Sequence, residues 1–182
     1  MQEIAKVTTS DVPDSARELI AEVTLALRDR PKLARMFALC FANTLQTTVK
    51  ETADGTTFVI TGDIPAMWLR DSAAQVRPYL LLAREDEAIR RMIAGVVRRQ
   101  MRYIIHDPYA NAFNETANGA RWSDEDETEM SDLVWERKYE VDSLCYPVQL
   151  AYLLWKATGS TEHFDPEFRR AVDRILDVWT IE

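Results

Sequence analysis

The sequence is short of basic residues, of cysteine and of long apolar runs. Its 22 Lys and Arg residues stand against 30 Asp and Glu residues, which gives a net charge of −8. Nucleic acid and anionic lipid both require a basic protein face, so we expect neither as a partner, while a neutral ligand stays open. No segment approaches the roughly 18 apolar residues of a membrane span, and the N-terminus lacks the basic and apolar regions of a secretory signal. These absences predict a cytoplasmic protein.

The two cysteines, Cys40 and Cys145, lie in apolar helical patterns and not at the spacing of metal ligands. We expect both to be small buried side chains in a reducing compartment, with a disulfide between them as the alternative. The acidic run 124–129 lacks the glycine-punctuated spacing of a calcium-binding loop, so it predicts a solvated run or the first turn of a helix. No metal and no cofactor is predicted.

Apolar residues at helical spacing are the main pattern that is present. With 47% hydrophobic and 29% charged residues, the chain has the composition of one globular domain over residues 1–182. Helices are predicted over residues 13–28, 32–47, 72–83 with a break at Pro78, 85–105, 143–157 and 166–182. A short β-hairpin is predicted from residues 47–49 and 57–60, which flank an Asp-Gly turn. We therefore expect a mainly α-helical fold.

The predicted helices differ in how much of their surface is apolar. Helix 32–47 is apolar over much of its circumference and should be more buried than helix 13–28, and helix 143–157 is apolar nearly all round and should be enclosed by other helices. Helix 85–105 is apolar on one side and carries three arginines on the other, which predicts a solvated outer face. Such alternation is expected of a toroid in which an outer ring of helices wraps an inner ring. Since the apolar pattern still runs at Glu182, we expect a truncated chain.

The densest group of functional side chains lies between residues 61 and 79. Ser72 and Gln75 have the spacing of a capping box at the start of a helix, so the residues before them are expected in a loop. The loop holds Asp63, Trp68, Arg70 and Asp71. Carboxylates and a guanidinium suit the hydroxyls of a neutral polyhydroxylated ligand, and an aromatic ring suits its C–H face. The alternative is an Arg-Asp pair and a buried Trp that brace the loop.

Two further segments carry residues suited to a sugar. Segment 107–135 has little periodicity and holds aromatic and amide side chains, among them Asn118 and Trp122, so we expect it to be functional or disordered. Glu140 and Asp142 stand at the predicted N-terminus of helix 143–157, where a carboxylate is stabilised by about 0.3–1 kcal/mol. Both are better suited to bind hydroxyls or act as a base than to act as a general acid. The alternative for each is a helix cap.

The segment from Gly62 to Ser72 reads Gly-Asp-Ile-Pro-Ala-Met-Trp-Leu-Arg-Asp-Ser and resembles the signature of glycoside hydrolase family 125, the bacterial and fungal exo-α-1,6-mannosidases. The block 135–147, Trp-Glu-Arg-Lys-Tyr-Glu-Val-Asp-Ser-Leu-Cys-Tyr-Pro, is also similar, as is Ala117-Asn118-Gly119 followed by Trp122. The resemblance runs from about Phe37 to the C-terminus. It implies an inverting, metal-independent hydrolase built as an (α/α)6 barrel, or six-hairpin toroid. The six helices predicted here would be about half of it, the N-terminal part.

The resemblance further implies that this chain supplies the subsite for the terminal mannose of an oligosaccharide or glycan. Arg70 and Asp71 would hold its hydroxyls with Asp142 opposite, and Trp68 or Trp122 would lie against its face. The further candidates for substrate binding are Asp63, Asn118 and Glu140. The catalytic acid and base are expected C-terminal to these blocks, so no catalytic residue is assigned to this chain, with Asp142 as the runner-up.

Two other classes of function remain open from the sequence. A sugar-binding module without hydrolysis would share every feature above, and an activity assay on α-1,6-linked mannobiose would separate it from an enzyme. An inert or partner-dependent fragment would instead associate through the exposed surface of a half-barrel, because uncovered apolar faces drive association.

Overall fold

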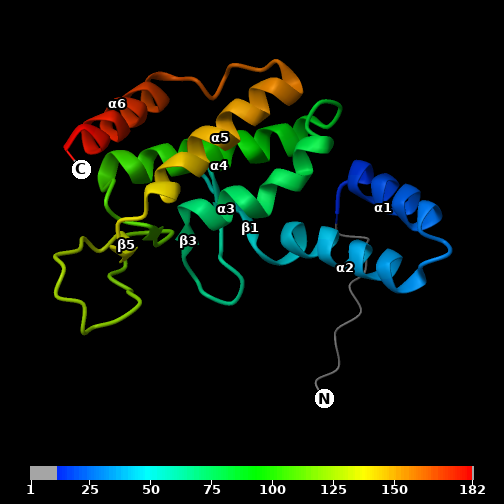
Figure 1. Cartoon of the computed structure of the whole chain (residues 1–182), viewed down its shortest axis with the longest axis horizontal. Helices are drawn as coiled ribbons and strands as arrows, with labels where there is room; N and C mark the ends of the chain where they lie inside the picture. The colour runs from blue at the N-terminus through cyan, green and yellow to red at the C-terminus, as the bar shows by residue number, and fades with distance from the viewer. Residues whose placement is uncertain (1–11, 182) are drawn as a thin grey trace. The chain divides into compact units, whose positions relative to one another are not determined.

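The computed structural model describes residues 12–181 and forms two compact units, Met1–Val49 and Lys50–Glu182. The chain is mainly α-helical, as predicted, with six α-helices among the described residues (Figure 1). None of these helices is long and apolar enough to cross a membrane. That residues 1–182 form a single domain stays a prediction.

The first unit contains two helices, α1 (Asp14–Ala26) and α2 (Pro31–Thr47), which pack against each other. Both match the predicted helices. Pro31 is the first residue of α2, a position where the missing N–H loses no hydrogen bond within the helix. Helix α2 buries Ala34, Phe41 and Ala42, whereas α1 buries Ala16 and Ile20 and has a larger share of exposed residues, so the prediction that the second helix is the more buried of the two is confirmed.

The second unit begins with a hairpin and continues as short strands that alternate with helices. In chain order its elements are β1 (Val49–Glu51), β2 (Thr57–Val59), β3 (Met67–Trp68), α3 (Leu69–Val76), the 3₁₀ helix η2 (Arg77–Leu81), α4 (Glu87–His106), β4 (Ala112–Phe113), β5 (Val134–Glu136), α5 (Val141–Thr158) and α6 (Pro166–Ile181). Strands β1 and β2 pair as the predicted hairpin, with Gly55 at a φ of 74° in the turn. The predicted break at Pro78 is confirmed, because α3 gives way to η2 there.

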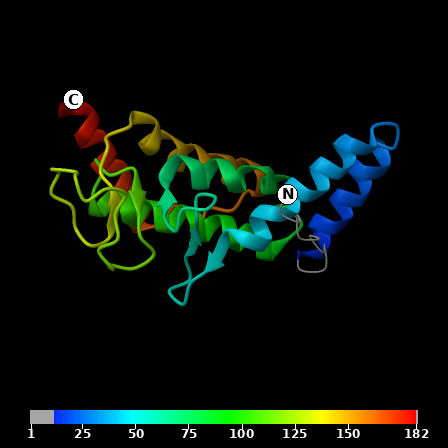
Figure 2. The same ribbon diagram turned by 90° about the horizontal axis from the view of Figure 1, so that it is seen from below.

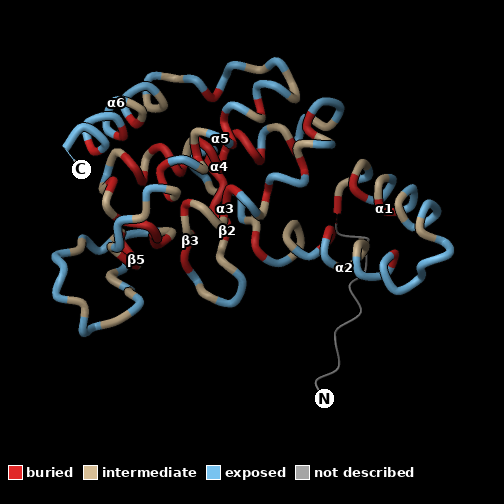
Figure 3. Tube along the Cα trace, in the orientation of Figure 1, coloured by how far each residue is buried: buried red, intermediate tan, exposed pale blue. Residues whose placement is uncertain are grey.

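Helix α4 is the central element of this unit and contacts α3, α5, α6 and β2 (Figures 1 and 3). Its buried residues include the polar side chains Arg99 and Gln100. The prediction of a solvated arginine face on this helix is partly wrong, because α6 packs along that face. Arg102, which lies on it, donates from Nε to Glu167 of α6 at 2.9 Å. The apolar pattern of the sequence could not predict how much of α4 is buried, because part of its buried surface is formed by polar residues that have hydrogen-bond partners.

Helix α3 packs along α5, and α4 packs along α6. The N-termini of α3 and α5 lie together, since Arg70 in the first turn of α3 is hydrogen bonded to Asp142 in the first turn of α5. Figure 2 shows the same helices from below. Two neighbouring helices with adjacent N-termini, each followed by a helix in a second layer, are what part of a helical toroid requires.

A three-stranded sheet with the order β3-β4-β5 was not predicted from the sequence. Its strands are two or three residues long, too short to give a period-two pattern. The sheet places Trp68, Ala112 and Glu136 in one row, because Trp68 pairs with Ala112 and Ala112 pairs with Glu136. The acidic run 124–129 between β4 and β5 forms no helix, which leaves the solvated run of the two predicted alternatives.

One face of α5 is uncovered, so the prediction that this helix is enclosed on all sides is wrong. Val141, Tyr152 and Trp155 are 55%, 51% and 39% exposed, and Cys145 on the same helix is exposed. Cys40 on α2 is exposed too and both thiols are free, so the prediction of two buried cysteines is wrong and no disulfide joins them.

Helix α4 approaches β2 closely at Gly95. A Cβ atom at this position would lie 2.4 Å from Thr57 Oγ1 and 3.0 Å from the Thr57 backbone nitrogen. We expect Gly95→Ala to lower the free energy of unfolding by about 1–3 kcal/mol, since the strand must move away from the helix. This loss outweighs the gain in helix propensity of about 1 kcal/mol. Urea denaturation measures the effect, and an unchanged or raised stability would contradict the close contact.

His163, between α5 and α6, is 1% exposed, and its Nε2 lies 2.8 Å from the Ala151 carbonyl oxygen, to which it donates. Burial lowers the pKa of His163. The unfolded chain therefore takes up this proton first, so stability is expected to fall as the pH drops below about 6.5. In His163→Phe this part of the pH dependence should vanish between pH 7 and 5. His106→Gln, at an exposed histidine, should keep the wild-type dependence; equal curves for wild type and His163→Phe would contradict the assignment.

Candidate functional site

Strand β3 runs directly into α3, so the helix starts three residues before the predicted position. Trp68 precedes it in an extended conformation with a ψ of 138°. Ser72 lies inside the helix and is buried, and its Oγ donates to the Trp68 carbonyl oxygen at 2.6 Å. Gln75 Nε2 donates to the Ile60 carbonyl oxygen at 3.3 Å. The predicted capping box is therefore wrong.

This early start moves Arg70 and Asp71 from the predicted loop into the first helical turn. Gln100 of α4 braces the turn from behind, because its Nε2 donates to the Leu69 carbonyl oxygen at 3.0 Å and to Ser72 Oγ at 2.9 Å. A helix position restricts side-chain direction more than a loop position does. The guanidinium of Arg70 is thus presented by a rigid element.

The second segment of the site is the start of α5. Glu140 occupies the N-cap position but makes no side-chain hydrogen bond to the helix backbone; its Oε2 accepts from Ser143 Oγ at 3.0 Å. Asp142 lies in the first turn, and its Oδ2 accepts a hydrogen bond from Arg70 Nη1 at 2.9 Å. Neither carboxylate caps the backbone as the alternative reading requires, so both are available to the site.

Arg70 is the centre of a cluster with three carboxylates, which we call the Arg70 cluster: Arg70, Asp71, Glu140 and Asp142. Besides the bond to Asp142, Arg70 Nε lies 3.6 Å from Asp71 Oδ2, and Nη1 lies 4.0 Å from Glu140 Oε2. The four side chains are between 34% and 42% exposed. The cluster is therefore fixed by its own contacts yet open to a ligand.

The electrostatics of the Arg70 cluster favour a ligand that donates hydrogen bonds. The hydrogen bond to Asp142 and the neighbouring carboxylates raise the pKa of Arg70, so it stays a cation. One cation faces three carboxylates whose side chains are 34% to 42% exposed, which leaves acceptor oxygens open to a donor from a ligand. Asp71 Oδ2 is not among the open ones, because it is buried, and it has no hydrogen-bond partner among the described residues. Sugar hydroxyls supply such donors. Among residues 12–181, no three His, Cys, Asp or Glu side chains are grouped to hold a metal ion.

Trp68 adjoins the cluster at the end of β3 and is half-buried. Its side chain lies close enough to Glu136, two strands away in the sheet, to help lower the pKa of that carboxyl group. Burial raises the pKa of Glu136, but hydrogen bonds from Lys138 and Asn111 outweigh burial, so the pKa lies below its usual value. The indole therefore lies near a carboxylate that stays ionised.

Three predicted residues are not joined to the Arg70 cluster by any hydrogen bond or ring contact in the described part of the chain. Asp63 is exposed in the turn between β2 and β3. Asn118 is exposed, and its Oδ1 accepts from the Ala120 backbone N–H at 3.0 Å, which makes it a turn residue. Trp122 is 54% exposed, and its backbone N–H donates to Trp135 at 2.9 Å.

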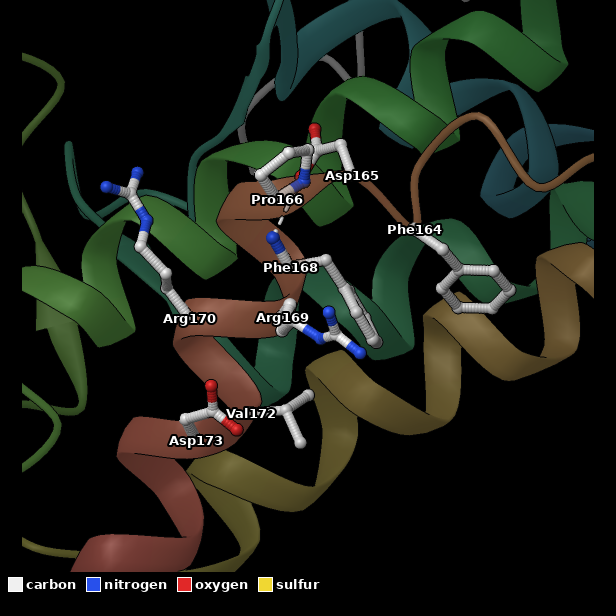
Figure 4. Close-up of a pocket in the computed structure, with 8 residues that line it drawn as sticks. All are labelled: Phe164, Asp165, Pro166, Phe168, Arg169, Arg170, Val172 and Asp173. Atoms are coloured by element: carbon white, nitrogen blue, oxygen red, sulfur yellow. Dashed lines mark hydrogen bonds between the residues drawn. The ribbon is translucent and has the colours of Figure 1, made fainter.

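A hollow of about 860 Å³ lies elsewhere, on α6 (Figure 4). Its lining includes the apolar side chains Phe164, Phe168 and Val172. A second hollow of about 460 Å³ lies between α5 and α6 and shares Phe164 and Phe168. Neither hollow includes a residue of the Arg70 cluster, and the first brings two carboxylates together, Asp165 and Asp173, where the cluster has three. Volume does not point to the Arg70 cluster, and we assign the candidate site by its chemistry.

Comparison with known proteins shows the family of this chain. The family model described as metal-independent α-mannosidase (GH125) matches residues 30–182. The chain belongs to glycoside hydrolase family 125. The resemblance seen in the sequence is thereby confirmed, and the Arg70 cluster carries residues from both of its blocks, the signature at 62–72 and the block at 135–147.

Two proteins that this chain is similar to are considerably longer than it. A solved structure of a metal-independent α-mannosidase from Streptococcus pneumoniae, a non-productive complex with α-1,6-mannobiose, is 51% identical, with a TM-score of 0.91 over 94% of this chain and 40% of its own. The meiotically up-regulated gene 157 protein of Schizosaccharomyces pombe is 39% identical over 90% of this chain and 34% of its own length. The chain thus spans about a third to two fifths of these proteins.

Sequence reasoning missed three residues that support the GH125 site: Gln100, Asn111 and Glu136. Gln100 lies in a helix that its apolar pattern marked only as amphipathic, and Asn111 precedes a strand of two residues. Glu136 stood inside the recognised block, yet nothing in the sequence indicated that it reaches across the sheet to Trp68.

Proposed function

We propose that this chain supplies the terminal-mannose subsite of an exo-α-1,6-mannosidase that works with inversion and without metal. The observation that supports it is the Arg70 cluster, in which two GH125 blocks far apart in sequence meet around one guanidinium. In this proposal Arg70 donates to the mannose hydroxyls, Asp71 and Asp142 accept from them, and Trp68 packs against the C–H face of the sugar.

The proposed reaction is hydrolysis of a terminal α-mannosidic bond. Inversion needs a general acid and a general base whose carboxyl groups lie about 6.5–9.5 Å apart, so that a water molecule fits between base and sugar. The three carboxylates of the Arg70 cluster surround one cation, which suits them to bind the hydroxyls of the substrate. The acid and base are proposed to lie outside this cluster.

The complete gene product tests this proposal. Incubated with α-1,6-mannobiose and a chelator, it is expected to stay active and to release β-mannose first, as followed by proton NMR of the anomeric signals. First release of α-mannose, or complete loss of activity with the chelator, would contradict the mechanism. Binding of mannobiose without any hydrolysis would favour a sugar-binding module.

A partner-dependent fragment is the second candidate, and exposed apolar side chains on α5 and α6 favour it. Tyr152 and Trp155 on α5 and Leu176 and Trp179 on α6 are 39% to 52% exposed. Exposed apolar area of this kind drives association. Sedimentation velocity of residues 1–182 is expected to show a concentration-dependent shift to larger species, and a monomer at all concentrations would remove this candidate.

A further inference from the structure

Asn111 lies at the point where the two segments of the Arg70 cluster meet. It precedes β4, is 1% exposed, and its backbone carbonyl oxygen accepts from the Leu69 N–H at 3.0 Å. Leu69 is the residue before Arg70 and the first residue of α3. Asn111 therefore anchors the helix turn that carries the guanidinium.

The side chain of Asn111 holds the other segment. Its Nδ2 donates to Glu136 Oε2 at 2.6 Å, and its Oδ1 accepts from the Lys138 backbone N–H at 3.1 Å. Lys138 is followed after one residue by Glu140, so this bond fixes the chain just before α5. Lys138 Nζ donates to Glu136 Oε1 at 2.8 Å, which gives each carboxylate oxygen of Glu136 its own donor.

The sheet register extends this arrangement to Trp68. Trp68, Ala112 and Glu136 form one row across β3, β4 and β5, and side chains in such a row lie on the same face of a sheet. The small methyl group of Ala112 leaves room for Trp68 and Glu136 to approach each other above it, and Trp68 contributes to the lowered pKa of Glu136. Asn111 and Glu136 thus touch every segment of the site while being too buried to contact a ligand freely.

We infer that Asn111 and Glu136 are positioning residues, which set the placement of Arg70 and Trp68 relative to Asp142 and so determine the affinity for the terminal sugar. The identity of the ligand in this inference rests on the proposed function, whereas the contacts made by Asn111 and Glu136 do not. Without the pair, α3 and α5 would keep their apolar contacts, yet the spacing between the guanidinium and the carboxylates would no longer be fixed to a fraction of an ångström.

Asn111→Asp is the sharpest test because it keeps the side-chain volume and replaces the Nδ2 donor by an oxygen 2.6 Å from Glu136 Oε2. The charged residues hydrogen bonded within this group are Glu136 and Lys138. Two carboxylates at such a distance share a proton only at lower pH. Affinity for α-1,6-mannobiose is expected to fall at least tenfold at pH 7 and to recover at pH 5, relative to wild type at each pH.

Asn114→Asp is the matched control. Asn114 stands at the other end of β4, is also 1% exposed, and its Nδ2 donates to the carbonyl oxygens of Ala120 and Asp132 at 2.7 and 3.0 Å. It loses the same kind of donor without touching either segment of the Arg70 cluster. Its affinity for mannobiose should stay within threefold of wild type at both pH values. Equal losses in the two variants, or no recovery of Asn111→Asp at pH 5, would overturn the inference.

Amide hydrogen exchange gives a readout that needs no ligand. In the wild type, the Leu69 and Lys138 amides should both be protected from exchange, because Leu69 donates to the backbone oxygen of Asn111 and Lys138 to its side-chain oxygen; unprotected exchange of either amide would overturn the inference. In Asn111→Asp both rates should rise at least tenfold at pH 7, and in Asn114→Asp neither should. If wild type does not bind mannobiose, the proposed function fails, and exchange alone decides whether Asn111 couples the two segments.

Discussion

Replacement of Arg70 by alanine is expected to weaken binding of α-1,6-mannobiose to this chain by at least tenfold. The change removes the hydrogen bond to Asp142 at 2.9 Å and leaves three carboxylates facing one another without a cation. A lost hydrogen bond to a charged group costs about 1.5–3 kcal/mol, and about 1.4 kcal/mol is tenfold in affinity. Isothermal titration calorimetry of the 182-residue chain measures the change.

Arg91→Ala is the control for Arg70→Ala. Arg91 is also a helical arginine paired with a carboxylate, Glu87 at 3.6 Å, but its side chain is 70% exposed on α4. It should bind mannobiose as wild type does. Asp71→Asn, which removes an acceptor charge, should weaken binding by tenfold or more. If Arg70→Ala instead binds normally while its melting temperature collapses, the residue only braces the start of α3.

Residues 1–182 assayed alone are expected to hydrolyse neither α-1,6-mannobiose nor an activated aryl α-mannoside above background. Loss of a general acid or base lowers the rate by about 10²–10⁴-fold, and a general acid needs an environment that keeps it protonated. The carboxylates of the proposed site all face Arg70, and Asp142 accepts a hydrogen bond from it. None is both buried and remote from a cation.

Turnover by this chain would be informative in one specific form. Robust hydrolysis that Asp142→Asn abolishes, while Asp63→Asn at an exposed turn leaves it unchanged, would contradict the expectation and make Asp142 a catalytic residue. A fluorogenic aryl α-mannoside detects the slow rates at which this distinction has to be made.

The helices were largely predictable from the sequence because their apolar residues recur at the helical period over several turns. The limits of α4 and α5 fall within about two residues of the prediction at most ends, and the break at Pro78 follows from its missing N–H. How each helix is buried could not be predicted so well. The polar residues Arg99 and Gln100 are buried because they find partners, and Tyr152 and Trp155 are exposed because no described element covers them.

The site was predictable where its functional residues stand close together in the sequence. It was less predictable where strand pairing brings residues together. Arg70, Asp71, Glu140 and Asp142 were all named from the sequence, and the structure brings them together. The helix start at Leu69 was missed, since Ser72 and Gln75 have the spacing of a cap yet bond to Trp68 and Ile60. The sheet of very short strands, and with it the role of Asn111, follows only from tertiary contacts.

A crystal structure of this chain with α-1,6-mannobiose tests the central claim most directly. The account predicts one mannose at the Arg70 cluster, with its hydroxyl oxygens within about 3.2 Å of Arg70 nitrogens and of Asp71 or Asp142 oxygens. The ring of Trp68 should lie against the C–H face of that mannose. A disaccharide bound only in the hollow between α5 and α6, with the Arg70 cluster unchanged and unoccupied, would contradict it.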